Sequence, residues 1–223
     1  MEIPAKMSDA RSTARRLMRE SLDRGDALSW FEHLYDQAKG DTTAIPWADC
    51  AVNPQLARWL TDRQVRSLTA LDVGCGLGDN AEALAAAGYD VTAFDVAPSA
   101  IKWAKLRFPH SPVLYAVANL LSLPQEWRER FDLVVEAFTL QVLPPAERIR
   151  AMHSLVSALS PQGTLLVICR AREVHDPEGA MPWPLTRVEI NQFLTEKLNV
   201  QRWDDFTDQE VPPVRRFLIE FKR

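Results

Sequence analysis

Cysteines are few in this sequence, and the few that occur are not arranged as a site. The 223 residues include three, Cys50, Cys75 and Cys169, with no Cys-x-x-Cys spacing and no histidine beside them to complete a zinc site. An odd number of widely separated cysteines argues against a disulfide framework. We therefore expect no metal site and a chain suited to a reducing, cytoplasmic environment.

Long apolar runs are also absent. No run approaches the ~20 apolar residues needed to span a bilayer. The segment from Arg11 to Arg19 is polar and rich in arginine, without the apolar core of a secretory signal. A transit peptide is the alternative for this segment, because Arg, Ser and Thr alternate in it, although Asp9 and Glu20 argue against one. We expect no contact with a membrane.

The sequence has no excess of positive charge. It carries 26 Lys and Arg against 30 Asp and Glu, a formal net charge of -4. A protein that binds nucleic acid usually presents a basic footprint, which this composition lacks. We therefore expect a small-molecule partner, no nucleic acid, and either a monomer or a homodimer.

Local patterns divide the chain into a helical preface and an α/β domain. Residues 12–24 and 27–39 are predicted to be helices, and Asn53-Pro54 is a helix cap followed by proline at the first helical position, opening a helix through Leu60. Residues 1–64 are thus predicted to be an N-terminal helical extension, and residues 65–223 the main domain, within a single domain overall.

From residue 68 onward, short apolar runs alternate with helical stretches, which is typical of βαβ units in a parallel sheet. The predicted strands are 68–73, 90–95, 113–117, 131–136 and 164–169, and the helices between them are near 79–87, 98–107 and 145–159. A helix near 186–197 and two further strands, 199–206 and 214–222, follow. The last two are predicted to form a hairpin at the sheet edge, giving seven strands with an antiparallel finish and helices on both faces.

A glycine-rich loop follows the first predicted strand. The strand ends at Leu71-Asp72-Val73 and continues into Gly74-Cys75-Gly76-Leu77-Gly78, directly before a helix. Glycines let the backbone turn sharply and approach a ligand, and the helix N-terminus favours an anion. The dinucleotide pattern Gly-x-Gly-x-x-Gly has its third glycine where Asp79 stands, and a carboxylate there suits pyrophosphate poorly.

Two polar residues follow the next two strands. Asp95 ends the second strand, where its carboxylate is placed to accept hydrogen bonds from both hydroxyls of a ribose, and Asn119 follows the third, where its amide is placed to recognise a base edge. The alternatives are structural: a glycine triplet is often only a tight turn, and Asp95 alone is a plausible helix cap before Pro98. The shared order and spacing favour a nucleoside with a short anionic attachment.

The sequence here resembles the class I S-adenosylmethionine-dependent methyltransferases, whose hallmark is an acidic residue followed by Gly-x-Gly-x-Gly. The resemblance covers residues 68–170 and implies a Rossmann-like fold with S-adenosylmethionine as cofactor. It implies that Asp72 and the glycine loop surround the methionine moiety, Asp95 the ribose, and Asn119 with Leu120 the adenine, although Asn119 departs from the commoner Asp. The predicted cofactor-binding residues are Asp72, Gly74, Cys75, Gly76, Gly78, Asp95, Val96, Asn119, Leu120 and Glu136.

The methyl acceptor is expected at the carboxyl ends of the fourth and fifth strands, where ligands bind in open α/β sheets. The predicted substrate-binding residues are Trp47, Phe138, Gln141, Arg170 and Trp183. The segments Ile45-Pro46-Trp47 and Met181-Pro182-Trp183 resemble those of the thiopurine, thiol and halide methyltransferases, although Ala180-Met181 replaces the expected Gly-Pro. Plain packing at the edge of the core explains the two tryptophans equally well. Any lid is expected from the N-terminal helices or the loop after Arg170.

Methyl transfer from a sulfonium is a single displacement, in which the protein mainly orients the acceptor and excludes water. His33 and His153 lie in helical patterns, His110 lies in a loop, and we expect His175 to be solvated rather than to act as a base. No catalytic residue is therefore assigned. We expect a thiol or other soft nucleophile as acceptor, since it ionises readily. The alternatives are methylation of a small molecule on nitrogen or oxygen, a non-catalytic cofactor-binding regulator and, disfavoured by Asp79, a nicotinamide-dependent oxidoreductase.

Overall fold

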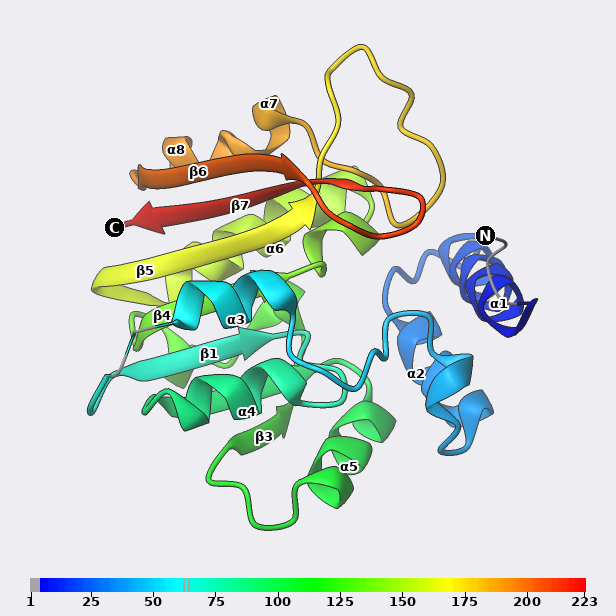
Figure 1. Cartoon of the computed structure of the whole chain (residues 1–223), viewed down its shortest axis with the longest axis horizontal. Coiled ribbons are helices and arrows are strands. Elements are labelled where there is room, and N and C mark those ends of the chain that lie inside the picture. Colours follow the sequence, from blue (N-terminus) through cyan, green and yellow to red (C-terminus); the bar gives the residue numbers. More distant parts are fainter. Residues whose placement is uncertain (1–4, 62, 64) are drawn as a thin grey trace.

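The computed structural model of the protein describes residues 5–61, 63 and 65–223, and its centre is one seven-stranded sheet (Figure 1). The strands are β1 (Thr69–Val73), β2 (Asp90–Asp95), β3 (Leu114–Val117), β4 (Phe131–Ala137), β5 (Leu159–Arg170), β6 (Asn199–Thr207) and β7 (Arg215–Lys222). Their order across the sheet is β3-β2-β1-β4-β5-β7-β6. β7 runs antiparallel to both β5 and β6, and the remaining pairs are parallel. The predicted α/β sheet with an antiparallel last strand is confirmed.

The helices cover both faces of the sheet because side chains alternate along buried strands. In β5, Leu165 and Val167 pack with α6 (Pro145–Ala158) on one face, whereas Leu166 and Ile168 pack on the other. That other face is covered by α3 (Pro54–Leu60), α4 (Asp79–Ala86) and α5 (Pro98–Arg107). For brevity we call it the α4 face and the first the α6 face. Parallel strands buried on both sides account for the near-continuous apolar runs of the sequence.

The N-terminal helices lie beyond the carboxyl ends of the strands rather than on a face of the sheet (Figure 1). They are α1 (Ala5–Leu22) and α2 (Ser29–Ala38), followed by the short 3-10 helix η1 (Thr42–Ala44). Trp30 and Leu34 of α2 are buried in a separate apolar cluster that includes Leu77 of the glycine loop and Ala97. The preface therefore packs directly against the region where the sequence places the cofactor. The predicted boundary between residues 64 and 65 falls at a residue outside the described ranges.

Two elements near the C-terminus differ from their predictions. β5 begins at Leu159, not 164, because Leu159 pairs with Phe131 before the register shifts, and the next paired residue is Thr164. The helix predicted near 186–197 is two short helices, α7 (Arg187–Ile190) and α8 (Gln192–Thr195). After Asn191 the backbone bonds span three residues, from Leu194 N–H to Asn191 O, so the α-helical pattern tightens and ends.

Short 3-10 helices complete the connections, namely η2 (Leu120–Ser122), η3 (Gln125–Trp127) and η4 (Leu140–Val142). Within the described residues, no helix has the length and apolar character to cross a membrane. The same part of the chain holds no group of three or more His, Cys, Asp or Glu side chains placed to bind a metal ion.

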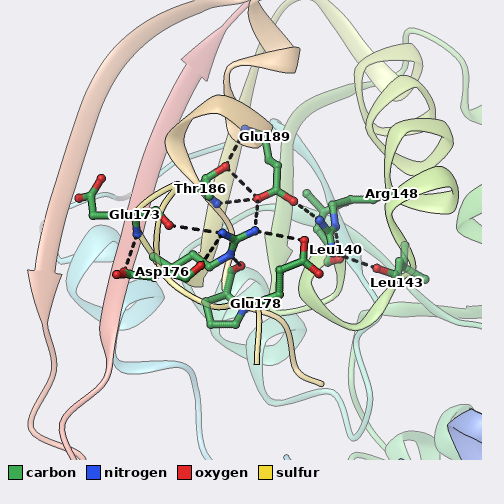
Figure 2. Close-up of polar contacts among 10 residues, drawn as sticks. Leu140, Leu143, Arg148, Glu173, Asp176, Glu178, Thr186 and Glu189 are labelled. Carbon is green, nitrogen blue, oxygen red and sulfur yellow. Dashed lines mark hydrogen bonds and ion pairs between the residues drawn. The ribbon is translucent and has the colours of Figure 1, made fainter. Parts of the chain in front are cut away.

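A buried arginine joins η4 to the C-terminal helices. Arg148 of α6 donates from Nε to the Leu140 carbonyl at 3.1 Å and from Nη2 to the Leu143 carbonyl at 3.1 Å, and it forms an ion pair with Glu189. Figure 2 shows that Glu189 also closes a capping box with Thr186 at the start of α7. The Arg148 side chain thus holds the Leu140 and Leu143 carbonyls in place and, through Glu189, fixes the position of α7.

We expect Arg148→Met to lower the free energy of unfolding by about 2–3 kcal/mol, because it leaves two carbonyls and Glu189 without their buried partner. Arg150→Met on the same helix is the matched control, since Arg150 is exposed and, among the described residues, pairs only with Glu147. We expect the control to change stability by less than about 0.5 kcal/mol. Urea denaturation followed by circular dichroism measures both, and equal effects of the two substitutions would contradict this assignment.

Candidate active site

The glycine loop requires its glycines because other side chains press against it. Gly74, Gly76 and Gly78 have φ angles of 63°, 51° and 92°, in the left-handed region. A Cβ on Gly74 would collide with Thr139 Oγ1, and one on Gly78 with the Tyr115 hydroxyl. At Gly76 a Cβ would lie 3.2 Å from the Tyr35 hydroxyl, so α2 closes over this part of the loop. Any residue but glycine would therefore meet both backbone strain and steric conflict here.

Asp95 connects the end of β2 to this loop. Its Oδ2 accepts a hydrogen bond from Gly76 N–H at 3.0 Å, and its Oδ1 accepts one from Ala97 N–H at 2.9 Å. Burial raises the pKa of Asp95 to about 6, although backbone hydrogen bonds from Ala97, Gly76 and Val96 lower it. The group is thus oriented by the backbone and keeps capacity to accept a further hydrogen bond.

Asp72 is a second buried carboxyl, on the same α4 face of the sheet. Its Oδ2 has no hydrogen-bond partner among the described residues, and the backbone of Ala81 bonds to the group. Burial, followed by the charge of Asp95, raises the pKa of Asp72 to about 8. An unpaired carboxylate so close to another costs free energy, which a cation bound between them would recover.

Glu136 is a third buried carboxyl, on the opposite face of the sheet from Asp72 and Asp95. In the sheet register Glu136 lies opposite Val73 and so points to the α6 face, away from Asp72. Its Oε1 accepts from Thr139 N–H at 2.6 Å and Leu140 N–H at 2.9 Å, so the carboxyl holds the turn after β4. Burial raises the pKa of Glu136 to about 7. Its Oε2 is buried without a hydrogen-bond partner among the described residues, and a contact of Glu136 with the cofactor stays a prediction.

The remaining predicted cofactor residues lie in the loop or follow β2 and β3. Cys75 and Val96 are half-buried, and burial raises the pKa of the Cys75 thiol well above its usual range. Asn119 is half-buried, Leu120 is buried, and the Asn119 Oδ1 accepts from Leu121 N–H at 2.8 Å. Because the amide oxygen caps η2, the Asn119 amino group is the more accessible of its two ends for a base.

The Asp79 carboxylate forms an ion pair, which weakens the objection to pyrophosphate that rested on its negative charge. Arg107 of α5 donates to both of its carboxylate oxygens, at 2.6 and 2.8 Å, and also to the Leu77 carbonyl at 2.7 Å. The pair therefore fixes the end of the glycine loop. Asp79 still replaces the third glycine of the dinucleotide pattern, but its paired carboxylate repels an anion less than a free one would. No local pattern indicates Arg107 as the partner of Asp79, because the two residues lie 28 positions apart.

The predicted acceptor residues come from three connections that meet at the carboxyl edge of the sheet. Gln141 Oε1 accepts from Arg170 N–H at 2.7 Å, and the Gln141 carbonyl accepts from Trp183 N–H at 2.7 Å. Phe138 has a φ of 69°, an unusual conformation for a bulky residue, and its ring lies 4.7 Å from Cζ of Arg216. Such strain at a strand end often accompanies a functional site.

Trp47 and Trp183 both pack against the N-terminal apolar cluster. Trp47 donates its indole N–H to the Tyr35 hydroxyl at 3.0 Å, and its ring meets those of Trp30 and Phe31 edge-on. Trp47 thus packs at the edge of the apolar core, which was the alternative to a substrate contact. It also holds the Tyr35 hydroxyl, which lies next to Gly76 of the loop. Tyr35 was not predicted, because helical periodicity cannot tell a core aromatic from one that covers a ligand site.

The four histidines are exposed. His175 lies in the loop after β5 with its side chain 85% exposed, and its nearest ion-pair partner is the adjacent Asp176 at 3.9 Å. His33 and His110 are exposed, and His153 of α6 pairs with Glu196, which follows α8. The structure thus places none of the four beside Asp72 or Asp95.

Comparisons with known proteins agree with this geometry. A family model described as a methyltransferase domain matches residues 70–163. The ubiquinone biosynthesis O-methyltransferase of Xanthomonas campestris pv. campestris is 38% identical over 121 residues, covering 52% of this chain and 49% of that protein. The enzyme of the same name from Pseudomonas paraeruginosa is 35% identical over 109 residues, 47% of each chain. The chain thus spans about half the length of the curated relatives it matches.

Solved structures resemble the whole sheet. The N-methyltransferase NodS from Bradyrhizobium japonicum WM9 matches with a TM-score of 0.61 and 26% identity, over 76% of this chain and 92% of that one. Magnesium protoporphyrin IX methyltransferase from Synechocystis PCC 6803, with S-adenosylmethionine bound, matches with a TM-score of 0.66 and 18% identity, over 87% and 96%. The chain therefore has the fold of the S-adenosylmethionine-dependent methyltransferases, and residues 70–163 match their methyltransferase domain.

Proposed function

We propose that this protein transfers a methyl group from S-adenosylmethionine to a small-molecule acceptor. The observation that carries the proposal is the pair of buried carboxyls, Asp72 and Asp95, beside a loop whose three glycines all have positive φ angles. S-adenosylmethionine supplies a methyl group on a cationic sulfonium, together with an ammonium group. Buried carboxylates without a protein cation beside them suit such a ligand.

Each residue of the site has a task in this proposal. Asp95 accepts hydrogen bonds from ribose hydroxyls, Asp72 meets the cationic methionine end, and Asn119 with Leu120 borders the adenine. Val96 and Cys75 line the space between them. Tyr35 and Trp47 cover the loop and exclude water, which strengthens the electrostatic interactions beneath them.

The accepting atom is the finer part of the proposal. A thiol or another readily ionised acceptor needs no general base, and the exposed histidines favour it. Methylation on oxygen is the second candidate, because the relatives from Xanthomonas and Pseudomonas are named as O-methyltransferases. The relatives reported above give no support to the narrower resemblance to thiopurine, thiol and halide methyltransferases.

Release of S-adenosylhomocysteine from S-adenosylmethionine tests the activity directly, with thiols, thiopurines, iodide, phenols and amines as acceptors. We expect turnover with at least one of these classes. Cofactor binding by calorimetry without turnover on any class would favour the non-catalytic regulator, and absence of cofactor binding would refute the proposal.

Replacing Asp95 tests the predicted ribose contact. We expect Asp95→Ala to weaken S-adenosylmethionine binding by about 1–3 kcal/mol, the usual cost of leaving polar partners unpaired. Asp90→Ala is the matched control, because Asp90 is the exposed first residue of the same strand. Calorimetry at pH 7.5 measures both variants, after thermal melts show that each is folded. Unchanged affinity in Asp95→Ala would remove Asp95 from the site.

The raised pKa of Asp72 predicts a pH-dependent stability of the cofactor-free protein. The folded state holds the Asp72 proton up to about pH 8, against an ordinary pKa of 3.8. The stabilisation from this protonated group is therefore complete below about pH 4 and is lost as the pH rises towards 8. We expect Asp72→Asn, which cannot ionise, to be more stable than the wild type at pH 8 by on the order of 1–2 kcal/mol.

Urea unfolding at pH 5 and pH 8 measures this difference, with Asp90→Asn as the exposed control on the neighbouring strand. The same Asp72→Asn variant should bind S-adenosylmethionine more weakly than the wild type. A variant that is no more stable at pH 8 than the wild type would show that Asp72 is ionised in the free protein without cost.

A further inference from the structure

Two arginines face each other at the carboxyl end of the sheet. Arg170 is the last residue of β5, and the antiparallel register places it directly opposite Arg216 of β7. Both belong to the α4 face, because their neighbours two residues away, Ile168 and Leu218, pack there. Like charges directly opposite in a sheet repel each other, so this pair needs compensation.

Glu210 and Asp208 act on Arg170 only through their charge, whereas direct ion pairs go to Arg216. Its guanidinium forms ion pairs with Asp208 and Glu210 from the β6–β7 turn, and it lies over the ring of Phe138. The guanidinium of Arg170 has no hydrogen bond or ion pair with any residue that the structure describes, although the side chain is half-buried. Burial, followed by the charge of Arg216, lowers the pKa of Arg170.

Arg170 is placed within the predicted acceptor site. Its backbone N–H donates to Gln141 Oε1 at 2.7 Å, and its carbonyl accepts from Leu185 N–H at 2.8 Å, so it lies between η4 and the segment that carries Trp183. Arg11 of α1 is close enough to act electrostatically on Arg170, and it also has no ion pair within the described part of the chain. Figure 1 shows the β6–β7 turn reaching towards α1 at this edge.

The neighbouring carboxyls limit how much negative charge a ligand beside Arg170 can carry. Asp49 lies within electrostatic reach of Arg11, Arg216 and Glu210, and burial followed by the charge of Glu210 raises its pKa. A doubly charged phosphate would be repelled more strongly than a singly charged group by Asp49 and Glu210, whose charges act on this cluster. A carboxylate carries one negative charge and matches the planar fork of a guanidinium.

We propose that Arg170, assisted by Arg11, binds a carboxylate group of the methyl acceptor. This inference rests on the proposed methyl transfer, and it adds the substrate class: a small carboxylic acid that bears the nucleophile on another atom. Arg170 is then a specificity-determining residue, whereas Arg216 serves to hold the β6–β7 turn and the ring of Phe138.

Matched pairs of acids and their esters test the proposal. The probes are 3,4-dihydroxybenzoate and 4-mercaptobenzoate, each with its methyl ester, which supply oxygen and sulfur nucleophiles with and without the carboxylate. Phenyl phosphate serves as the dianionic probe. Binding to protein saturated with S-adenosylhomocysteine is measured by calorimetry, and turnover by release of S-adenosylhomocysteine from S-adenosylmethionine.

We expect at least one acid to bind about tenfold more tightly than its ester, a difference of ~1.4 kcal/mol. Arg170→Gln should abolish this preference by raising KM for the acid with kcat and the ester's KM nearly unchanged, and Arg170→Lys should retain part of it. Arg11→Gln should weaken it less. Arg202→Gln on β6 and Arg16→Gln on α1 are controls, since their side chains pair at the surface with Asp204 and Glu20.

The proposal is overturned if acid and ester bind equally, if no acid binds at millimolar concentration, if phenyl phosphate binds more tightly than the acids, or if folded Arg170→Gln keeps the preference. These outcomes leave the proposed function intact whenever S-adenosylhomocysteine binds and any neutral acceptor turns over. Failure of the protein to bind S-adenosylhomocysteine in the first titration refutes both.

Discussion

The hydrogen bond from Gly76 N–H to the Asp95 carboxylate is the interaction on which the site depends. It joins the end of β2 to the middle of the glycine loop, 19 positions earlier in the chain, and it keeps an ionisable group buried at the carboxyl edge of the sheet. Asp72 lies beside it with one oxygen unsatisfied and holds its proton up to about pH 8, so ionising it in the cofactor-free protein costs free energy. Such an arrangement costs stability in the free protein and gives selectivity for a cationic ligand, since the cost is recovered only when a cation arrives.

The loop keeps its shape because distant residues surround it closely. Thr139 follows β4, Tyr115 lies in β3 and Tyr35 lies in α2, yet each comes within contact distance of one of the three glycines. The Arg107–Asp79 pair fixes the end of the loop from a fourth element. Because these neighbours belong to different elements, the loop is rigid only in the complete fold, including the N-terminal helices. This is the physical reason to regard α2 as part of the active site rather than as an appendage.

The sequence allowed the sheet, its helices and the cofactor loop to be predicted because these features are local. Alternation of apolar runs, Asn53 before Pro54, and the spacing of the glycines are all legible within a few residues. What was missed depended on register or on long-range pairing. The face to which Glu136 points follows from its pairing with Val73, and the early start of β5 follows from the contact of Leu159 with Phe131. Likewise, the neutralisation of Asp79 required a partner on another helix, which no local pattern reveals.

The cofactor side and the acceptor side of the site also differ in how far the similarity to relatives covers them. The segment that matches the methyltransferase domain, residues 70–163, contains Asp72, the glycine loop, Asp95 and Asn119. Arg11, Trp47, Arg170, Trp183 and Arg216 all lie outside it. The acceptor edge is built from the N-terminal preface, the end of β5 and the antiparallel β7, so relatives that share the matched segment need not share the acceptor. Unpaired charge at this edge is therefore better evidence for the proposed acceptor than the names of the relatives, because the charge belongs to the residues predicted to touch the acceptor.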